Sequence, residues 1–261
     1  FISGDEVYRP MYQELFGDLP DVSDPVRFPV NAAPGDNPEW NKAWQAMANA
    51  DQHSITRAFS NLGKCIAAYE MLLVPQPSKF DYYVEAELRK DSTKQQSLFT
   101  PNEKMGLRLF IGKAGCTNCH NGPLLTNNEF HNTGLVSSVG EIPDKGRVEG
   151  VRLVRADPFN CAGKYSDAKP NDCTELRFMR SGIDLIGAMR TPSLRNLEGS
   201  GPYMHKGQVE HLSQVLDHYN RAPEAMIGHN EAEPLGLNDL ELRQLEDFLN
   251  TLSSPASAAI P

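Results

Sequence analysis

Cys116-Thr117-Asn118-Cys119-His120 is the stretch of this sequence that decides its fold. Two cysteines three positions apart, with a histidine directly after the second, form the pattern for covalent attachment of a c-type haem. One helical turn carries both thiols to the same side, where each can bond one vinyl group of the haem, and His120 then binds the iron. A thioredoxin-like redox pair needs a βαβ context, and half of a zinc site needs a second pair of ligands. Neither is visible in the sequence.

Length and composition limit the classes of protein that fit. The 261 residues suffice for one large domain or two modest ones, with 39% hydrophobic and 23% charged residues. A formal charge of −9 argues against a nucleic-acid partner, because nucleic-acid-binding domains carry basic surfaces. No apolar run approaches the length of a membrane span. Haem c is attached outside the cytoplasm and no signal peptide heads the chain, so we expect a mature, periplasmic protein.

The other three cysteines divide into a pair and a single residue. Cys161 and Cys173 flank a short polar stretch. A disulfide between them would stabilise the fold by roughly 3 kcal/mol in the chain-entropy estimate, and it suits an oxidising compartment. Two free loop thiols are the alternative. Cys65 lies within a helical pattern, and we expect it to be a small buried apolar residue.

Helical patterns alternate with long irregular stretches. Prolines interrupt residues 1–53, and residues 76–99 are polar, with no helix assigned. An amphipathic helix is predicted over 54–74, with Ser54 as its cap. A capping box at Thr100 and Glu103 opens a helix that leads to the haem cysteines. Residues 124–190 are expected to be mostly loop.

Two further helices are predicted near the C-terminus. Leu212, Leu216 and Tyr219 mark one face of the first, and a cap at Asn238 and Glu241 opens the second.

Two arginines follow the predicted loop region. Arg190 and Arg195 are natural partners for haem propionates, since a guanidinium matches a carboxylate in fork geometry. Solvated surface arginines are the alternative. His131 has Asn, Thr and Gly around it, and we expect a surface or propionate-contacting residue rather than an iron ligand.

Together these motifs resemble the bacterial di-haem cytochrome c peroxidases and their MauG-like relatives. Their order matches the C-terminal haem domain of that family, and the helix over 54–74 with Phe80-Asp81 resembles the segment before it. The resemblance implies an all-α fold, with a helical and irregular segment over 1–96 and a cytochrome-c-like haem domain with long loops over 97–261. The runs that carry it are Gly106-Leu107-Arg108-Leu109-Phe110, Cys116 to Pro123, Asp144-Lys145-Gly146-Arg147, Thr191 to Asn196 and Pro202-Tyr203-Met204-His205.

The family members carry two haems, whereas this chain has one attachment motif. We therefore expect one haem c here and a second in an N-terminal haem domain that is missing from this chain. Segment 1–96 would pack on that domain. The chain is then the C-terminal part of a longer or cleaved polypeptide, or a mono-haem derivative. We favour the first because the helix over 54–74 has no evident partner.

The resemblance also places the second iron ligand. The peroxidases have a methionine fourteen residues after the motif histidine, and counting from His205 reaches Tyr219, as in MauG-like proteins. A phenolate stabilises ferric and higher-valent iron, whereas a thioether favours ferrous iron. Periodicity alone would make Tyr219 a core residue. The rival ligands are Met189, Met204 and Met226.

Further site residues are implied by the same resemblance. His205 is expected at the cofactor. The backbone carbonyls of Ser200 and Pro202 are expected to bind a calcium ion.

Two classes of function compete. In a MauG-like oxidase, hydrogen peroxide generates high-valent haem, which removes electrons from a protein partner. The alternative is an electron-transfer haem domain that feeds a peroxidase site where hydrogen peroxide is reduced. Tyrosine ligation favours the first, and the missing domain weakens it. A gas or redox sensor is a third class, but no signalling domain is attached.

Overall fold

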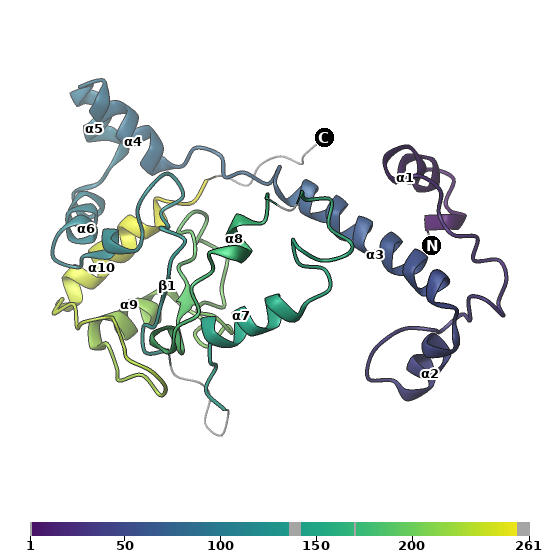
Figure 1. Cartoon of the computed structure of the whole chain (residues 1–261). Coiled ribbons are helices and arrows are strands. Elements are labelled where there is room, and N and C mark those ends of the chain that lie inside the picture. The colour runs from purple at the N-terminus through teal and green to yellow at the C-terminus, as the bar shows by residue number, and fades with distance from the viewer. Residues whose placement is uncertain (1, 136–141, 170, 255–261) are drawn as a thin grey trace. The chain divides into compact units, whose positions relative to one another are not determined.

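The computed structural model describes residues 2–135, 142–169 and 171–254. Within these ranges the chain forms ten α-helices and one two-stranded ribbon (Figure 1), which confirms the predicted all-α class. The helices are α1 (Tyr8–Phe16), α2 (Pro38–Ala46), α3 (Asn49–Glu70), α4 (Lys79–Leu88), α5 (Ser92–Leu98), α6 (Pro101–Ile111), α7 (Arg147–Ala156), α8 (Thr174–Arg177), α9 (Leu212–Arg221) and α10 (Asp239–Asn250). Strands β1 (Phe130–His131) and β2 (Met189–Arg190) pair antiparallel. Short 3-10 turns are η1 (Ile2–Gly4), η2 (Cys116–Asn118) and η3 (Ile183–Leu185).

Two compact units make up the chain. The first comprises residues 1–74 and 158–173, and the second comprises 75–157 and 174–261. The second unit contains the predicted haem-attachment motif. A domain boundary at residue 96, and the packing of 1–96 on an N-terminal haem domain, stay predictions.

The first unit is built on α3. Segment 158–173 lies on this helix, where the Arg57 guanidinium donates to the carbonyls of Lys164 at 3.0 Å and Tyr165 at 3.2 Å. Cys161 and Cys173 form the predicted disulfide, with their Cα atoms 5.6 Å apart. The helix therefore has packing partners within the chain, which the sequence did not reveal.

Two expectations about α3 are wrong. The helix begins at Asn49, well before the predicted Ser54 cap, and the Ser54 hydroxyl instead donates to the Ala50 carbonyl at 2.9 Å. Cys65 is exposed rather than buried. Its neighbours Ile66 and Tyr69 are also exposed, at 58% and 53% of their surface, so the described part of the chain leaves these side chains uncovered.

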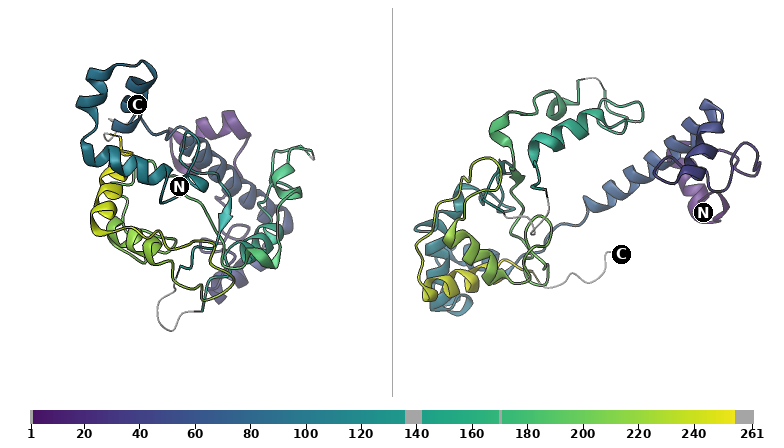
Figure 2. Two further views of the ribbon diagram at one scale, coloured as in Figure 1. Left: turned by 90° about the vertical axis from the view of Figure 1, so that its left-hand side faces the viewer. Right: turned by 90° about the horizontal axis from the view of Figure 1, so that it is seen from below.

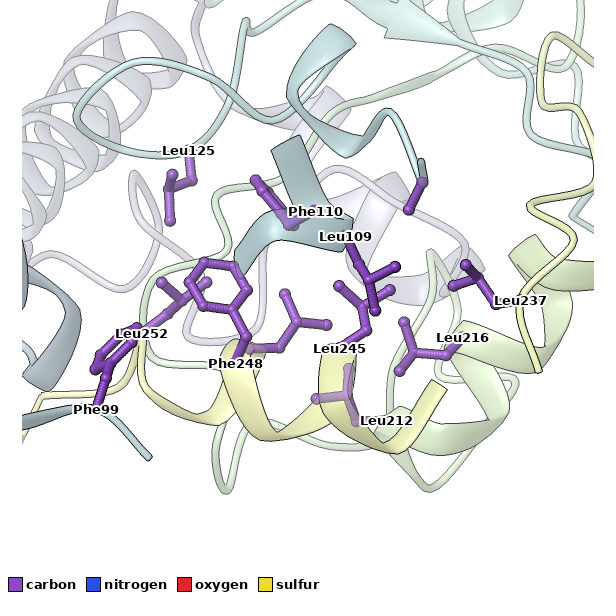
Figure 3. Packing of buried hydrophobic residues seen from close by; sticks show 12 residues of the cluster. Phe99, Leu109, Phe110, Leu125, Leu212, Leu216, Leu237, Leu245, Phe248 and Leu252 are labelled. Carbon is purple, nitrogen blue, oxygen red and sulfur yellow. The ribbon is translucent and has the colours of Figure 1, made fainter. Parts of the chain in front are cut away.

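The second unit has its hydrophobic core between α6, α9 and α10. Helix α10 contacts both α6 and α9 (Figures 1 and 2). Phe110 of α6 points toward Phe248 of α10, and their ring centroids are 5.1 Å apart (Figure 3). Leu245 and Phe248 have no exposed surface, and burying such side chains contributes about 1.5 to 3 kcal/mol each. The backbones approach closely at Gly106, where a Cβ would overlap the backbone of Gln244.

Local signals located the helices of this core. The capping box of Thr100 and Glu103 opens α6, and that of Asn238 and Glu241 opens α10, as predicted. Helices α1, α4, α5, α7 and α8 were not predicted. Helix α4 is opened by a capping box of Ser78 and Asp81, which its polar surroundings concealed.

Candidate functional site

The Cys116–His120 motif forms a tight turn directly after α6. Gly115 takes a left-handed conformation with φ 61°, which suits glycine, and redirects the chain into η2. The His120 amide donates to the Cys116 carbonyl at 2.8 Å, so one helical turn joins the first cysteine to the histidine. Both Cys116 and Cys119 are half-buried, free thiols. Burial raises the pKa of the Cys116 thiol to about 11, and it also raises the pKa of Cys119.

The imidazole of His120 is oriented by the loop that follows it. Its Nδ1 lies 3.0 Å from the Leu125 carbonyl, which assigns Nδ1 as the donor and leaves Nε2 as the candidate metal-binding nitrogen. Burial lowers the pKa of His120, and hydrogen bonding to the Leu125 and Pro192 backbone only partly offsets this. The ring is therefore neutral at pH 7, the state that binds a metal.

Tyr219 lies near the two cysteines. It follows Leu212 and Leu216 on the inner face of α9, and its side chain is half-buried. Burial raises the pKa of Tyr219, and the charges of Cys119 and Cys116 raise it further, while hydrogen bonding with the Thr133 side chain opposes the shift. Since both cysteines act on this phenol, the three side chains share one region of the second unit.

A hydrogen-bonded chain adjoins the attachment turn. The Asn127 amide donates to the Cys119 carbonyl at 2.8 Å, and its side-chain nitrogen lies 3.3 Å from Nε2 of His131. Nδ1 of His131 lies 2.8 Å from Glu231, which also accepts from the Asn132 amide at 3.1 Å. This chain joins the attachment turn to segment 226–237. The expectation that His131 is a surface or propionate-contacting residue stays a prediction.

The two arginines have different surroundings. Arg195 is 11% exposed and donates to both carboxylate oxygens of Asp81, at 2.6 and 2.8 Å, and to the Pro123 carbonyl. Arg190 is exposed and donates to Asn128 at 2.8 Å. Contact of either arginine with a haem propionate stays a prediction, but the donors of Arg195 are already taken by protein acceptors.

The remaining predicted residues have other recorded neighbours. His205 borders a small cavity together with Met189, Met226 and Asp144, and its Nε2 lies 3.9 Å from the Asp144 carboxylate. Met204 does not line this cavity. Ser200 and Pro202 are exposed. Calcium binding by their carbonyls stays a prediction, and within the described ranges no three His, Cys, Asp or Glu side chains gather to hold a metal.

Asp81 and Glu231 were missed as site residues. Each meets its partner only through the fold, since Asp81 is 114 positions from Arg195 and Glu231 is 100 positions from His131. The Phe80-Asp81 pair was noted in the sequence, but nothing local pointed to its arginine. No sequence signal marked Glu231.

Known proteins provide three informative comparisons. Cytochrome-c peroxidase IdrP2 of Denitromonas iodatirespirans is 31% identical over 225 residues, which cover 86% of this chain and 56% of that protein. Methylamine utilization protein MauG of Methylorubrum extorquens is 30% identical, covering 89% of this chain and 53% of that protein. The crystal structure of the diheme peroxidase BthA of Burkholderia thailandensis superimposes with a TM-score of 0.51 and 19% identity, covering 84% of this chain and 56% of that chain.

These comparisons concern the fold of the chain and the share of its relatives' length that it covers. The BthA superposition supports the helical fold alone. The chain spans about half the length of the curated relatives it matches. No protein-family model matches it. Among the described residues, no helix is both long and apolar enough to cross a membrane.

Proposed function

The chain belongs to the family of di-haem cytochrome c peroxidases and MauG, and from this premise we propose that it carries one haem c on Cys116 and Cys119. His120 and Tyr219 would be its iron ligands. The observations that support this proposal concern four side chains. The two free thiols lie within one helical turn of the His120 imidazole, whose Nδ1 is held by the Leu125 carbonyl, and both thiols raise the pKa of the Tyr219 phenol. This donor set fits a covalently held haem.

Each of these residues has a defined task. The Cys116 and Cys119 sulfurs would form the thioether bonds. The Nδ1–carbonyl contact of His120 fixes the ring plane and makes Nε2 more basic. Tyr219 must lose its proton to bind as a phenolate, and its raised pKa means that it is neutral at pH 7 until a metal competes for the oxygen. The bound haem supplies one-electron transfer and reactivity toward peroxide.

We propose that the activity is of the MauG-like type. Hydrogen peroxide is the oxidant, and a protein partner supplies the electrons. Both the relatives named above, a cytochrome-c peroxidase and MauG, are haem enzymes, which supports this reaction class. A second haem domain would complete the enzyme, because the family is di-haem and this chain has one attachment motif. The disulfide supports the periplasm as the compartment.

A second function is favoured by one observation. The chain spans about half of its curated relatives, so it can be the electron-transfer half of a peroxidase whose peroxide site lies elsewhere. In that case Tyr219 would have no role at the iron.

The haem count is tested first. Intact mass and a pyridine haemochrome assay should give one haem per chain, resistant to acid–acetone extraction. In a double variant with Cys116→Ala and Cys119→Ala, acid–acetone should extract any bound haem from the protein. Release of haem from the unchanged chain would contradict covalent attachment.

The type of activity is tested with the two-haem protein. Peroxide should drive oxidation of a protein partner in that protein, and a Tyr219→Met change should remove this oxidation while leaving electron transfer from a small reductant intact. If the methionine variant oxidises the partner equally well, the electron-transfer function is the correct one.

A further inference from the structure

A cavity of about 290 Å³ lies in the second unit, beside the β1–β2 ribbon. Phe130 lines it, and Phe130 pairs with Arg190, so these two side chains lie on the same face of the ribbon. His131 and Met189 lie on the opposite face. None of the residues proposed to hold the haem lines the cavity. The lining residues are Asn128, Glu129, Phe130, Arg147, Glu175, Phe178, Met179, Arg180 and Leu185.

Arg147 lines this cavity. Among the described residues its Nε is buried without a hydrogen-bond partner, a state that proteins avoid because the donor has lost its water. The guanidinium stacks on the Phe130 ring, with Cζ 4.0 Å from the ring centroid. Stacking occupies the face of the guanidinium and leaves its edge, where the N–H groups point, available to an acceptor.

The inner part of the cavity is lined by apolar side chains, and its rim carries charged ones. Phe130, Met179 and Leu185 are half-buried or buried, whereas Glu129, Glu175 and Arg180 are exposed. Arg180 is engaged by Asp184 at 3.1 Å. Burial lowers the pKa of Arg147, and the Glu129 carboxylate partly opposes that shift, so this rim charge also acts on the guanidinium. Arg147 is the cationic group beside the apolar residues of the inner part.

We propose that this cavity binds a small carboxylic acid with an aromatic or aliphatic body. The carboxylate accepts hydrogen bonds from the edge of Arg147, and the apolar body contacts Phe130, Met179 and Leu185, with Phe178 at the rim. A volume of about 290 Å³ is at the lower end of ligand pockets and suits an acid of the size of benzoate. Inorganic phosphate or sulfate fits less well, because the apolar walls give a strongly hydrated anion nothing in exchange for its water.

The test uses benzoate and the haem-loaded chain, with binding followed by ligand-observed NMR. Benzoate should bind saturably. The neutral isostere benzamide should bind at least about tenfold more weakly, because a charge-assisted hydrogen bond contributes free energy of that order. Arg147→Gln should weaken benzoate binding by about tenfold or more. Arg180→Gln is the matched control at the rim and should change it by less than about twofold.

Folding is monitored by the thermal unfolding of each variant. If Arg147→Gln does not fold, Met179→Trp, which fills the cavity, should abolish binding instead. Unchanged binding in the folded variants, or equal binding of benzamide, would overturn the proposal. So would benzoate binding seen only in the haem-free chain, since the carboxylate partner of Arg147 would then be a haem propionate.

Discussion

Tyr219 is the residue on which the two proposed functions divide. Its position beside the thiols supports iron ligation, but its raised pKa means that the phenol gives up its proton only to a strong competitor such as ferric iron. A packing role would leave the iron spectrum independent of this side chain.

We therefore predict that Tyr219→Phe changes the ferric spectrum of the haem-loaded chain and opens the iron to added cyanide or imidazole. Tyr219→Met should raise the reduction potential, on the order of a hundred millivolts within the roughly 0.8 V that axial ligands span. Absorption spectra and a redox titration measure both effects. Identical ferric spectra of the unchanged chain and Tyr219→Phe would show that Tyr219 is not a ligand.

Asp81 makes a pH-dependent contribution to stability. Burial raises the pKa of this carboxyl, but the hydrogen bonds from Arg195 and Ser78 outweigh it and hold the pKa below its ordinary value. A lowered folded-state pKa means that the stabilisation is full above about pH 4 and is lost as the pH falls through the folded value.

Asp81→Asn should lower the free energy of unfolding by about 1 to 2 kcal/mol at pH 7, since the pair is partly buried. The difference between variant and unchanged chain should shrink below about pH 4. Urea unfolding at pH 7 and pH 3 measures it. Asp184→Asn breaks the exposed Arg180 pair and is the control, with a change within about 0.5 kcal/mol. A difference that persists undiminished at pH 3 would refute the ion-pair explanation.

At the scale of elements, the second unit depends on the crossing of α6 and α10. Gly106 allows it, because a Cβ there would overlap the Gln244 backbone and come within 2.7 Å of Cβ of Phe248. Neither neighbour can yield, since one is helix backbone and the other belongs to a side chain with no exposed surface.

Gly106→Ala should therefore destabilise the unit by about 1 to 3 kcal/mol despite the better helix propensity of alanine. Gly150 in α7 is the matched control, because a Cβ there meets nothing within 4 Å. Gly150→Ala should stabilise by up to about 1 kcal/mol. Thermal unfolding compares the two. Equal effects of the two substitutions would mean that the helix crossing is not tightly packed.

How much of these elements the sequence predicts depends on how far apart the interacting residues are along the chain. Capping boxes connect residues three positions apart, so the starts of α6 and α10 could be read from Thr100 and Asn238. The pairing of Arg195 with Asp81 depends on how distant segments fold together, and no local pattern encodes it. Cys65 was misjudged for the same reason: a periodic apolar stripe predicts a helix face to be covered, but not whether its covering segment belongs to this chain.

At the scale of the whole molecule, an exposed apolar stripe along α3 and the residues after it is a candidate contact for a second haem domain. Ile66 and Tyr69 are more than half exposed, and Leu72, Leu73 and Val74 after the helix are exposed at 63%, 52% and 65%. Exposed apolar side chains that follow one another along the chain in this way mark a candidate interaction surface. The chain also spans only about half of its curated relatives. We propose that the second haem domain covers this stripe.

Cys65 reports on that contact directly. The other cysteines are occupied by the disulfide and, in the proposed haem-loaded state, by thioether bonds, so Cys65 is the thiol left to react. We predict that iodoacetamide labels it readily in the haem-loaded chain and at least about tenfold more slowly in a polypeptide that also carries the N-terminal haem domain, because a packed interface excludes the reagent. Mass spectrometry follows the labelling. Ile66→Glu, which places a charge in the proposed interface, should restore the fast rate in the longer polypeptide, whereas Ile183→Glu on the second unit should not. If Cys65 reacts equally fast with and without the second haem domain, this stripe is not where that domain docks.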